Sequence, residues 1–65
     1  MHPNWQVFSE LCKENGVRPT RVLTELGIPV GIATNWKNGI SYPKHDKVMK
    51  IAEYFGKESD EFYVV

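Results

Sequence analysis

Apolar residues recur at helical spacing through the first quarter of the chain. Between residues 5 and 15 they stand at i, i+3, i+6 and i+7, which places them on one helix face: Trp5, Phe8, Leu11 and Cys12. Asn4 can cap the start of this helix, and Gly16 can end it because glycine adopts left-handed backbone angles at little cost. The pattern predicts a first helix over residues 5–15.

A second, shorter helix is predicted over residues 19–26. Pro19 suits its first turn, where the missing N–H of proline is tolerated, and Gly27 ends it. Three apolar residues form its inner face: Val22, Leu23 and Leu26.

A third helix of about two turns is expected to open at Pro29. Ala33 and Trp36, three positions apart, point inward from it. Asn38 and Gly39 then stop it, because both residue types accept a positive φ.

The clearest amphipathic segment follows a loop at residues 40–43. Apolar residues repeat there at i, i+3, i+4 and i+7, up to Gly56: Val48, Ile51, Ala52 and Phe55. A final turn or two over residues 58–63 offers Phe62 to the core. The sequence shows no strand alternation, internal repeat or low-complexity segment. It therefore predicts an all-α fold, a compact bundle of about five short helices in a single domain, residues 1–65.

Composition narrows the class of protein. The chain has 65 residues, 42% of them apolar and 25% charged, as expected of a small globular domain. Its one cysteine, Cys12, can form neither a disulfide within the chain nor a zinc or redox pair, and we expect it to be a small buried hydrophobe. We expect a cytoplasmic protein, because there is no membrane-length apolar run and no signal peptide.

Nothing in the sequence suggests an enzyme. It offers no paired carboxylates in a plausible cleft, no nucleophile beside a base, no metal-ligand cluster and no phosphate-binding loop. We therefore expect no catalytic residues, no metal and no cofactor.

Charge is unevenly distributed, although the net charge is zero. Residues 1–17 carry −1 and residues 51–65 carry −3. The middle segment, residues 18–50, carries +4, because six basic residues oppose only Glu25 and Asp46: Arg18, Arg21, Lys37, Lys44, Lys47 and Lys50. A basic segment that contains the second and third helices favours contact with phosphates, while the alternative is a solvated surface with a chance excess.

The chain resembles the Cro-like and phage-repressor helix-turn-helix family, often called the XRE family, over nearly its whole length. The resemblance lies in Glu10-Leu11-Cys12, Pro19-Thr20, Thr24-Glu25-Leu26-Gly27-Ile28, Thr34-Asn35-Trp36-Lys37-Asn38-Gly39 and Lys50-Ile51-Ala52-Glu53-Tyr54-Phe55-Gly56. It implies a lambda-repressor-like, operator-binding domain, with the helix-turn-helix at about residues 19–37. The third helix would enter the major groove of double-stranded DNA.

Two positions depart from the family pattern together. Leu23 stands where the family usually has alanine, and Ala33 where it usually has isoleucine or valine. The two would face each other across the corner between the second and third helices. We infer that the large-for-small and small-for-large changes conserve core volume, the kind of exchange that cores tolerate best.

The outward face of the third helix supplies the predicted base-reading residues: Val30, Gly31, Thr34 and Asn35. An asparagine amide can pair with the N6 and N7 atoms of adenine, and Val30 can cover a thymine methyl. Thr34 can bond a base or a phosphate, and Gly31 lets the backbone approach. We expect modest, A·T-weighted discrimination. Ile32 is either a partly buried packing residue, which we favour, or a second methyl contact.

Phosphate contacts are predicted on both sides of that helix: Arg18, Thr20, Arg21, Lys37, Asn38, Ser41, Tyr42, Lys44 and Lys47. The helix starts have Arg18, Pro29 and Lys44 where the family favours Ser or Thr caps. The free backbone N–H groups at these helix starts would donate hydrogen bonds to either phosphates or water.

The chain end and the net charge leave alternatives open. A final apolar group could close the core or support a homodimer that binds an inverted repeat: Phe62, Tyr63, Val64 and Val65.

The function predicted is a sequence-specific transcriptional regulator, encoded by a phage, prophage or bacterial chromosome. The rival is a protein-interaction module, antirepressor or antitoxin-like, that binds a regulatory protein instead of DNA.

Overall fold

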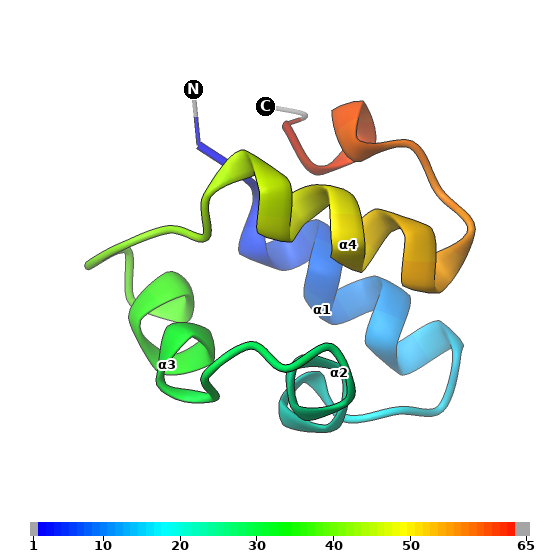
Figure 1. Ribbon diagram of the computed structural model, residues 1–65, viewed down its shortest axis with the longest axis horizontal. Coiled ribbons are helices and arrows are strands. Elements are labelled where there is room, and N and C mark those ends of the chain that lie inside the picture. The colour runs from blue at the N-terminus through cyan, green and yellow to red at the C-terminus, as the bar shows by residue number, and fades with distance from the viewer. Residues whose placement is uncertain (1, 64–65) are drawn as a thin grey trace.

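Four α-helices and a terminal 3-10 helix make up the computed structural model, which describes residues 2–63 (Figure 1). The helices are α1 (Trp5–Glu14), α2 (Pro19–Glu25), α3 (Gly31–Lys37), α4 (His45–Phe55) and the 3-10 helix η1 (Ser59–Tyr63). Residues 2–63 contain no strand. The all-α prediction is confirmed, but the fifth predicted helix is a short 3-10 turn rather than an α-helix. None of the helices described is long and apolar enough to span a membrane.

Helix α1 has the ends that its sequence predicts, to within one residue. The Asn4 side chain accepts a hydrogen bond from the backbone N–H of Gln6 at 2.8 Å, which is an N-cap. The last helical residue is Glu14 rather than Asn15, because Asn15 is the C-cap and donates its side-chain amide to the carbonyl of Leu11 at 2.7 Å. Gly16 follows in the left-handed region, with φ of 65°.

Helix α3 begins two residues later than Pro29, the residue predicted to open it. Its first α-helical residue is Gly31, and Val30 is the N-cap. The N–H groups of Ile32 and Ala33 donate to the carbonyls of Pro29 and Val30 at 3.1 and 3.0 Å. These bonds span three residues rather than four, so the turn at Pro29 is tighter than an α-helix and only leads into one.

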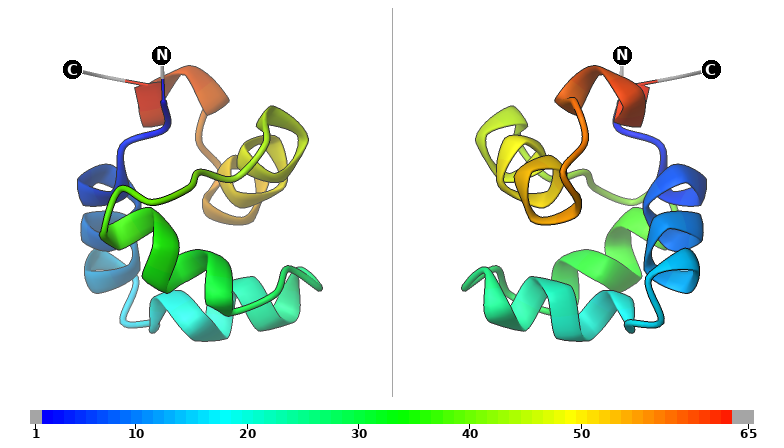
Figure 2. Two further views of the ribbon diagram at one scale, coloured as in Figure 1. Left: turned by 90° about the vertical axis from the view of Figure 1, so that its left-hand side faces the viewer. Right: turned by 90° about the vertical axis from the view of Figure 1, so that its right-hand side faces the viewer.

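Helices α2 and η1 lie on opposite sides of the molecule (Figure 2), and each packs against both α1 and α4. Helix α2 packs against α1, α3 and α4, whereas η1 packs against α1 and α4. Both views in Figure 2 show α2 and η1 on opposite sides of the molecule, with α3 beside α2. The pair α2 and α3 therefore forms one side of the protein.

Every α-helix and η1 contribute to one hydrophobic core. The buried apolar residues are Phe8, Leu11, Cys12, Val22, Leu23, Ile28, Ala33, Trp36, Val48, Ile51, Ala52 and Phe62. The prediction that Cys12 is a buried hydrophobe is confirmed, and burial raises the pKa of its thiol to about 11. Leu26, on the predicted inner face of the second helix, is only half-buried.

Trp36 anchors α3 to this core and to the N-terminal segment. Its ring stacks on Phe8 with centroids 5.0 Å apart, and its buried Nε1–H donates to the carbonyl of Pro3 at 2.8 Å. The N-terminal segment is held in turn by the backbone N–H of Asn4, which donates to the carbonyl of Phe62 in η1. The inward direction predicted for Trp36 is confirmed, whereas its bond to Pro3 was not predicted.

Candidate nucleic-acid interface

Helix α3 has one buried face and one face in solvent. Ala33 and Trp36 are buried, and Ile32 is half-buried, as the packing interpretation of that residue expects. The four predicted base-reading residues are all exposed: Val30, Gly31, Thr34 and Asn35. The buried face fixes the orientation of the helix on the core, and the other face stays accessible from solvent.

The loop after α3 folds back onto the end of that helix. The carbonyl of Asn35 accepts hydrogen bonds from the N–H groups of Ile40 and Ser41, at 2.8 and 3.4 Å. Gly39, with φ of 71°, makes this reversal possible. The backbone of Asn35 is therefore committed to the turn, and its exposed side-chain amide is the part that faces outward.

Tyr42 in the same loop lies against the N-terminal segment. Its ring stacks on that of His2, with centroids 3.9 Å apart and planes within 5° of parallel. The sequence had suggested Tyr42 as a phosphate contact but gave no sign of this partner. The stacking places His2 beside the predicted interface.

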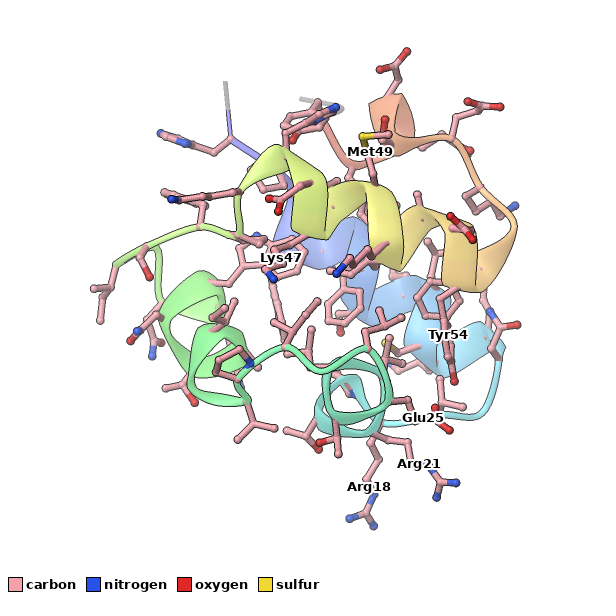
Figure 3. The ribbon with its side chains drawn as sticks, in the orientation of Figure 1. Arg18, Arg21, Glu25, Lys47, Met49 and Tyr54 are labelled. Atoms are coloured by element: carbon pink, nitrogen blue, oxygen red, sulfur yellow. The ribbon has the colours of Figure 1, made fainter. Side chains whose placement is uncertain are left out.

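The predicted phosphate-contacting residues are exposed, except Lys47, which is half-buried: Arg18, Thr20, Arg21, Lys37, Asn38, Ser41, Tyr42 and Lys44. They do not form one cluster. Figure 3 shows Arg18 and Arg21 projecting away from α4, beyond α2, whereas Lys47 lies on α4 and points toward the α2–α3 connection. The basic side chains labelled in Figure 3 therefore do not make a compact anion site.

Arg21 has an acidic neighbour that changes its electrostatics. Its Nε lies 3.8 Å from Oε1 of Glu25, one helical turn on, and Oε2 of Glu25 accepts a 2.7 Å hydrogen bond from the hydroxyl of Tyr54 on α4. That hydrogen bond raises the pKa of Tyr54. The i,i+4 spacing of Arg21 and Glu25 could have indicated their pairing. Nothing in the sequence indicates Tyr54.

The starts of α2, α3 and α4 have no side-chain caps. Arg18, Val30 and Lys44 occupy the N-cap positions, and none makes a capping hydrogen bond. The absence of caps agrees with the expectation from the sequence, except that Val30 rather than Pro29 is the N-cap of α3.

Of the four residues predicted as a possible dimer contact, the structure describes two, Phe62 and Tyr63. Phe62 is fully buried in the core, which leaves no exposed surface of its side chain for a second chain. Tyr63 is half-buried, and its hydroxyl lies 3.1 Å from Nδ1 of His45. Val64 and Val65 lie outside the described residues. Exposed apolar residues occur elsewhere, at Ile40 and Met49.

Within residues 2–63, no three His, Cys, Asp or Glu side chains gather as metal ligands would. In comparisons with known proteins, no family model, no curated protein and no solved structure matches the chain.

Proposed function

We propose that this protein is a sequence-specific, DNA-binding transcriptional regulator of the Cro-like or repressor-like kind. In this proposal α2 and α3 form the helix-turn-helix, and α3 enters the major groove of an operator. The observation that carries the proposal is the division of α3 into a face pinned by Trp36 and an exposed face of small and polar side chains. The major groove, about 12 Å wide, admits such a helix.

The exposed face of α3 has groups that suit base edges. The Asn35 amide can donate to and accept from adenine, and Val30, 49% exposed, offers methyl groups to thymine. Gly31 adds no side chain, although a Cβ there would meet no other part of the protein within 4 Å. Packing therefore does not require glycine at this position, whereas close approach of the backbone to DNA would favour it.

The surrounding charge supports contact with phosphates. Segment 18–50 carries +4, and its arginines and most of its lysines are exposed. Neutralised phosphates release counterions, so binding by these residues would weaken steeply as salt rises. An operator with two half-sites about one turn of DNA apart would suit a homodimer.

A titration of random duplex DNA at low and moderate salt tests the proposal. We expect the wild-type protein to bind at low salt and to lose affinity as salt rises, and Lys37→Ala to reduce the slope of log affinity against log salt by about 0.9. Lys57→Ala is the matched control. It removes the same charge beyond α4, outside the predicted contacts, and should leave the slope unchanged. Absence of wild-type binding even at low salt would contradict DNA recognition.

Selection from a random oligonucleotide pool tests the reading role of Asn35. The wild-type protein should select an inverted repeat, and Asn35→Ala should lose about 1–3 kcal/mol of preference for adenine at one position in each half-site. Asn38→Ala, at a predicted phosphate contact, should weaken binding to all sequences alike. A motif unchanged in Asn35→Ala would remove this residue from base reading.

A second candidate function is a protein-interaction module with the same fold. It is favoured by exposed apolar residues next to α3, since Ile40 is 72% exposed and Val30 is 49% exposed, and by the zero net charge. Such a module would bind a regulatory protein, as an antirepressor or antitoxin-like partner does. The salt titration separates the two functions, because this module would not bind DNA at low salt.

A further inference from the structure

Glu25 occupies a central position between a predicted DNA contact and another helix. Figure 3 shows Tyr54 extending from α4 toward Glu25 on α2, with Arg21 beyond it. Together with three neighbouring residues, these side chains line a surface groove: Gly16, Val17 and Arg18. The groove lies where α2 meets the end of α4.

The two oxygens of the Glu25 carboxylate have different partners. Oε2 accepts the Tyr54 hydroxyl at 2.7 Å, a short bond to a charged acceptor, and Oε1 lies 3.8 Å from Arg21 Nε. The bond from a second helix restricts where the carboxylate can go, so the negative charge stays beside Arg21. The ion pair itself is weak, because the Arg21 and Glu25 side chains are 72% and 44% exposed.

A DNA phosphate would have to compete with this carboxylate. If Arg21 left Glu25 for a phosphate, the DNA would release a counterion, but Arg21 would lose its attraction to the carboxylate, which would also repel the phosphate. The negative charge of Glu25 would therefore offset part of the gain, so that Arg21 neutralises a phosphate in fewer of the complexes. The pair is weak enough to break, so Arg21 can still reach DNA, but its contact is weaker than that of an arginine without an acidic neighbour.

We propose that Glu25, positioned by Tyr54, restrains Arg21 and so limits the affinity of the protein for the phosphate backbone of duplex DNA. This inference rests on the proposed function. Glu25 is a positioning residue here, since it acts on DNA only through Arg21. Contacts with phosphates carry no direct sequence information. By weakening one of them, Glu25 leaves a larger share of the recognition of DNA to α3.

The test compares Glu25→Gln with wild type on random duplex DNA across a fourfold range of salt. The glutamine can still accept the Tyr54 hydroxyl bond, but it has no charge to offer Arg21. We expect tighter binding and a slope steeper by up to about 0.9, the value for one full phosphate contact, so that the advantage of the variant over wild type grows by up to about three- to fourfold from the highest to the lowest salt. Thermal unfolding of both proteins checks that the fold is retained.

Two further variants separate the restraint from a general effect of charge. Asp60→Asn removes one negative charge from η1, on the opposite side of the molecule from α2, and should leave the slope unchanged. In an Arg21→Ala background, Glu25→Gln should no longer steepen the slope, because the residue that it releases is absent.

The outcomes distinguish this inference from the proposed function. Wild-type binding with an unchanged slope in Glu25→Gln would overturn the restraint alone. An equal effect of Glu25→Gln with and without Arg21 would also overturn it, since the charge would then act without Arg21. Absence of wild-type binding at every salt concentration would overturn the proposed function and the restraint with it.

Discussion

Trp36→Ala is expected to lower the free energy of unfolding by about 3–5 kcal/mol, the usual cost of removing a large buried aromatic side chain. Trp36 is 2% exposed, stacks on Phe8 and meets Trp5 edge-on with centroids 5.4 Å apart. A domain of this length typically has only roughly 3–10 kcal/mol of stability in total. Urea unfolding followed by circular dichroism should therefore show a much lower midpoint, and a partly unfolded protein even without urea.

Trp36→Phe divides this loss into packing and hydrogen bonding. The phenyl ring keeps much of the stacking on Phe8, but the carbonyl of Pro3 loses its 2.8 Å donor in a buried place. Leaving that acceptor unpaired should cost about 1–3 kcal/mol. Trp5→Ala, which removes a half-buried indole, is the control and should cost less than Trp36→Ala. A loss in Trp36→Ala no larger than that in Trp5→Ala would contradict the expectation that the buried indole contributes more to stability than the half-buried one.

The second large effect is expected at the pair formed by Leu23 and Ala33. Both are buried, at 0% and 6% exposure, on α2 and α3, which pack against each other. Leu23→Ala alone should cost about 2–5 kcal/mol through the cavity that it leaves. Ala33→Ile alone should cost about 1–3 kcal/mol through overpacking. The double variant should regain most of both losses, because one change fills the space that the other empties.

Thermal unfolding of the wild type, both single variants and the double variant measures this compensation as a double-mutant cycle. A melting temperature of the double variant close to wild type would establish that the two side chains share one space. A double variant whose loss equals the sum of the single losses would show that Leu23 and Ala33 pack independently. Their relation to the family pattern would then have no structural basis.

The helices could be predicted where a local signal marks both their faces and their ends. Helix α1 has its periodic apolar face, the Asn4 cap and Gly16, and its prediction was correct to within one residue. The start of α3 could not be placed as well, because Pro29 is equally suited to the tight turn that precedes the helix. The same limit holds for η1, since a short apolar turn does not specify α over 3-10 geometry.

The faces of α3 could be predicted because periodicity decides which side is buried once Trp36 is in the core. The contacts between distant positions could not. Tyr54 and Glu25 are 29 positions apart, and Trp36 and Pro3 are 33 apart. No periodicity relates residues at such separations, and only packing of the whole chain brings them together. The sequence therefore indicated Arg21 as a cation for DNA but not the Tyr54 hydroxyl that fixes the carboxylate of Glu25 beside it.

The bond from Asn4 to Phe62 joins residues near the two ends of the described chain, and the Pro3 carbonyl beside it receives Trp36. Closing so long a loop is entropically unfavourable until the intervening helices have packed. We therefore expect the final setting of α3 to be a late event in folding, because it needs residues near both ends of the described chain. During synthesis on the ribosome, α3 would acquire its full anchorage only after η1 had left the exit tunnel.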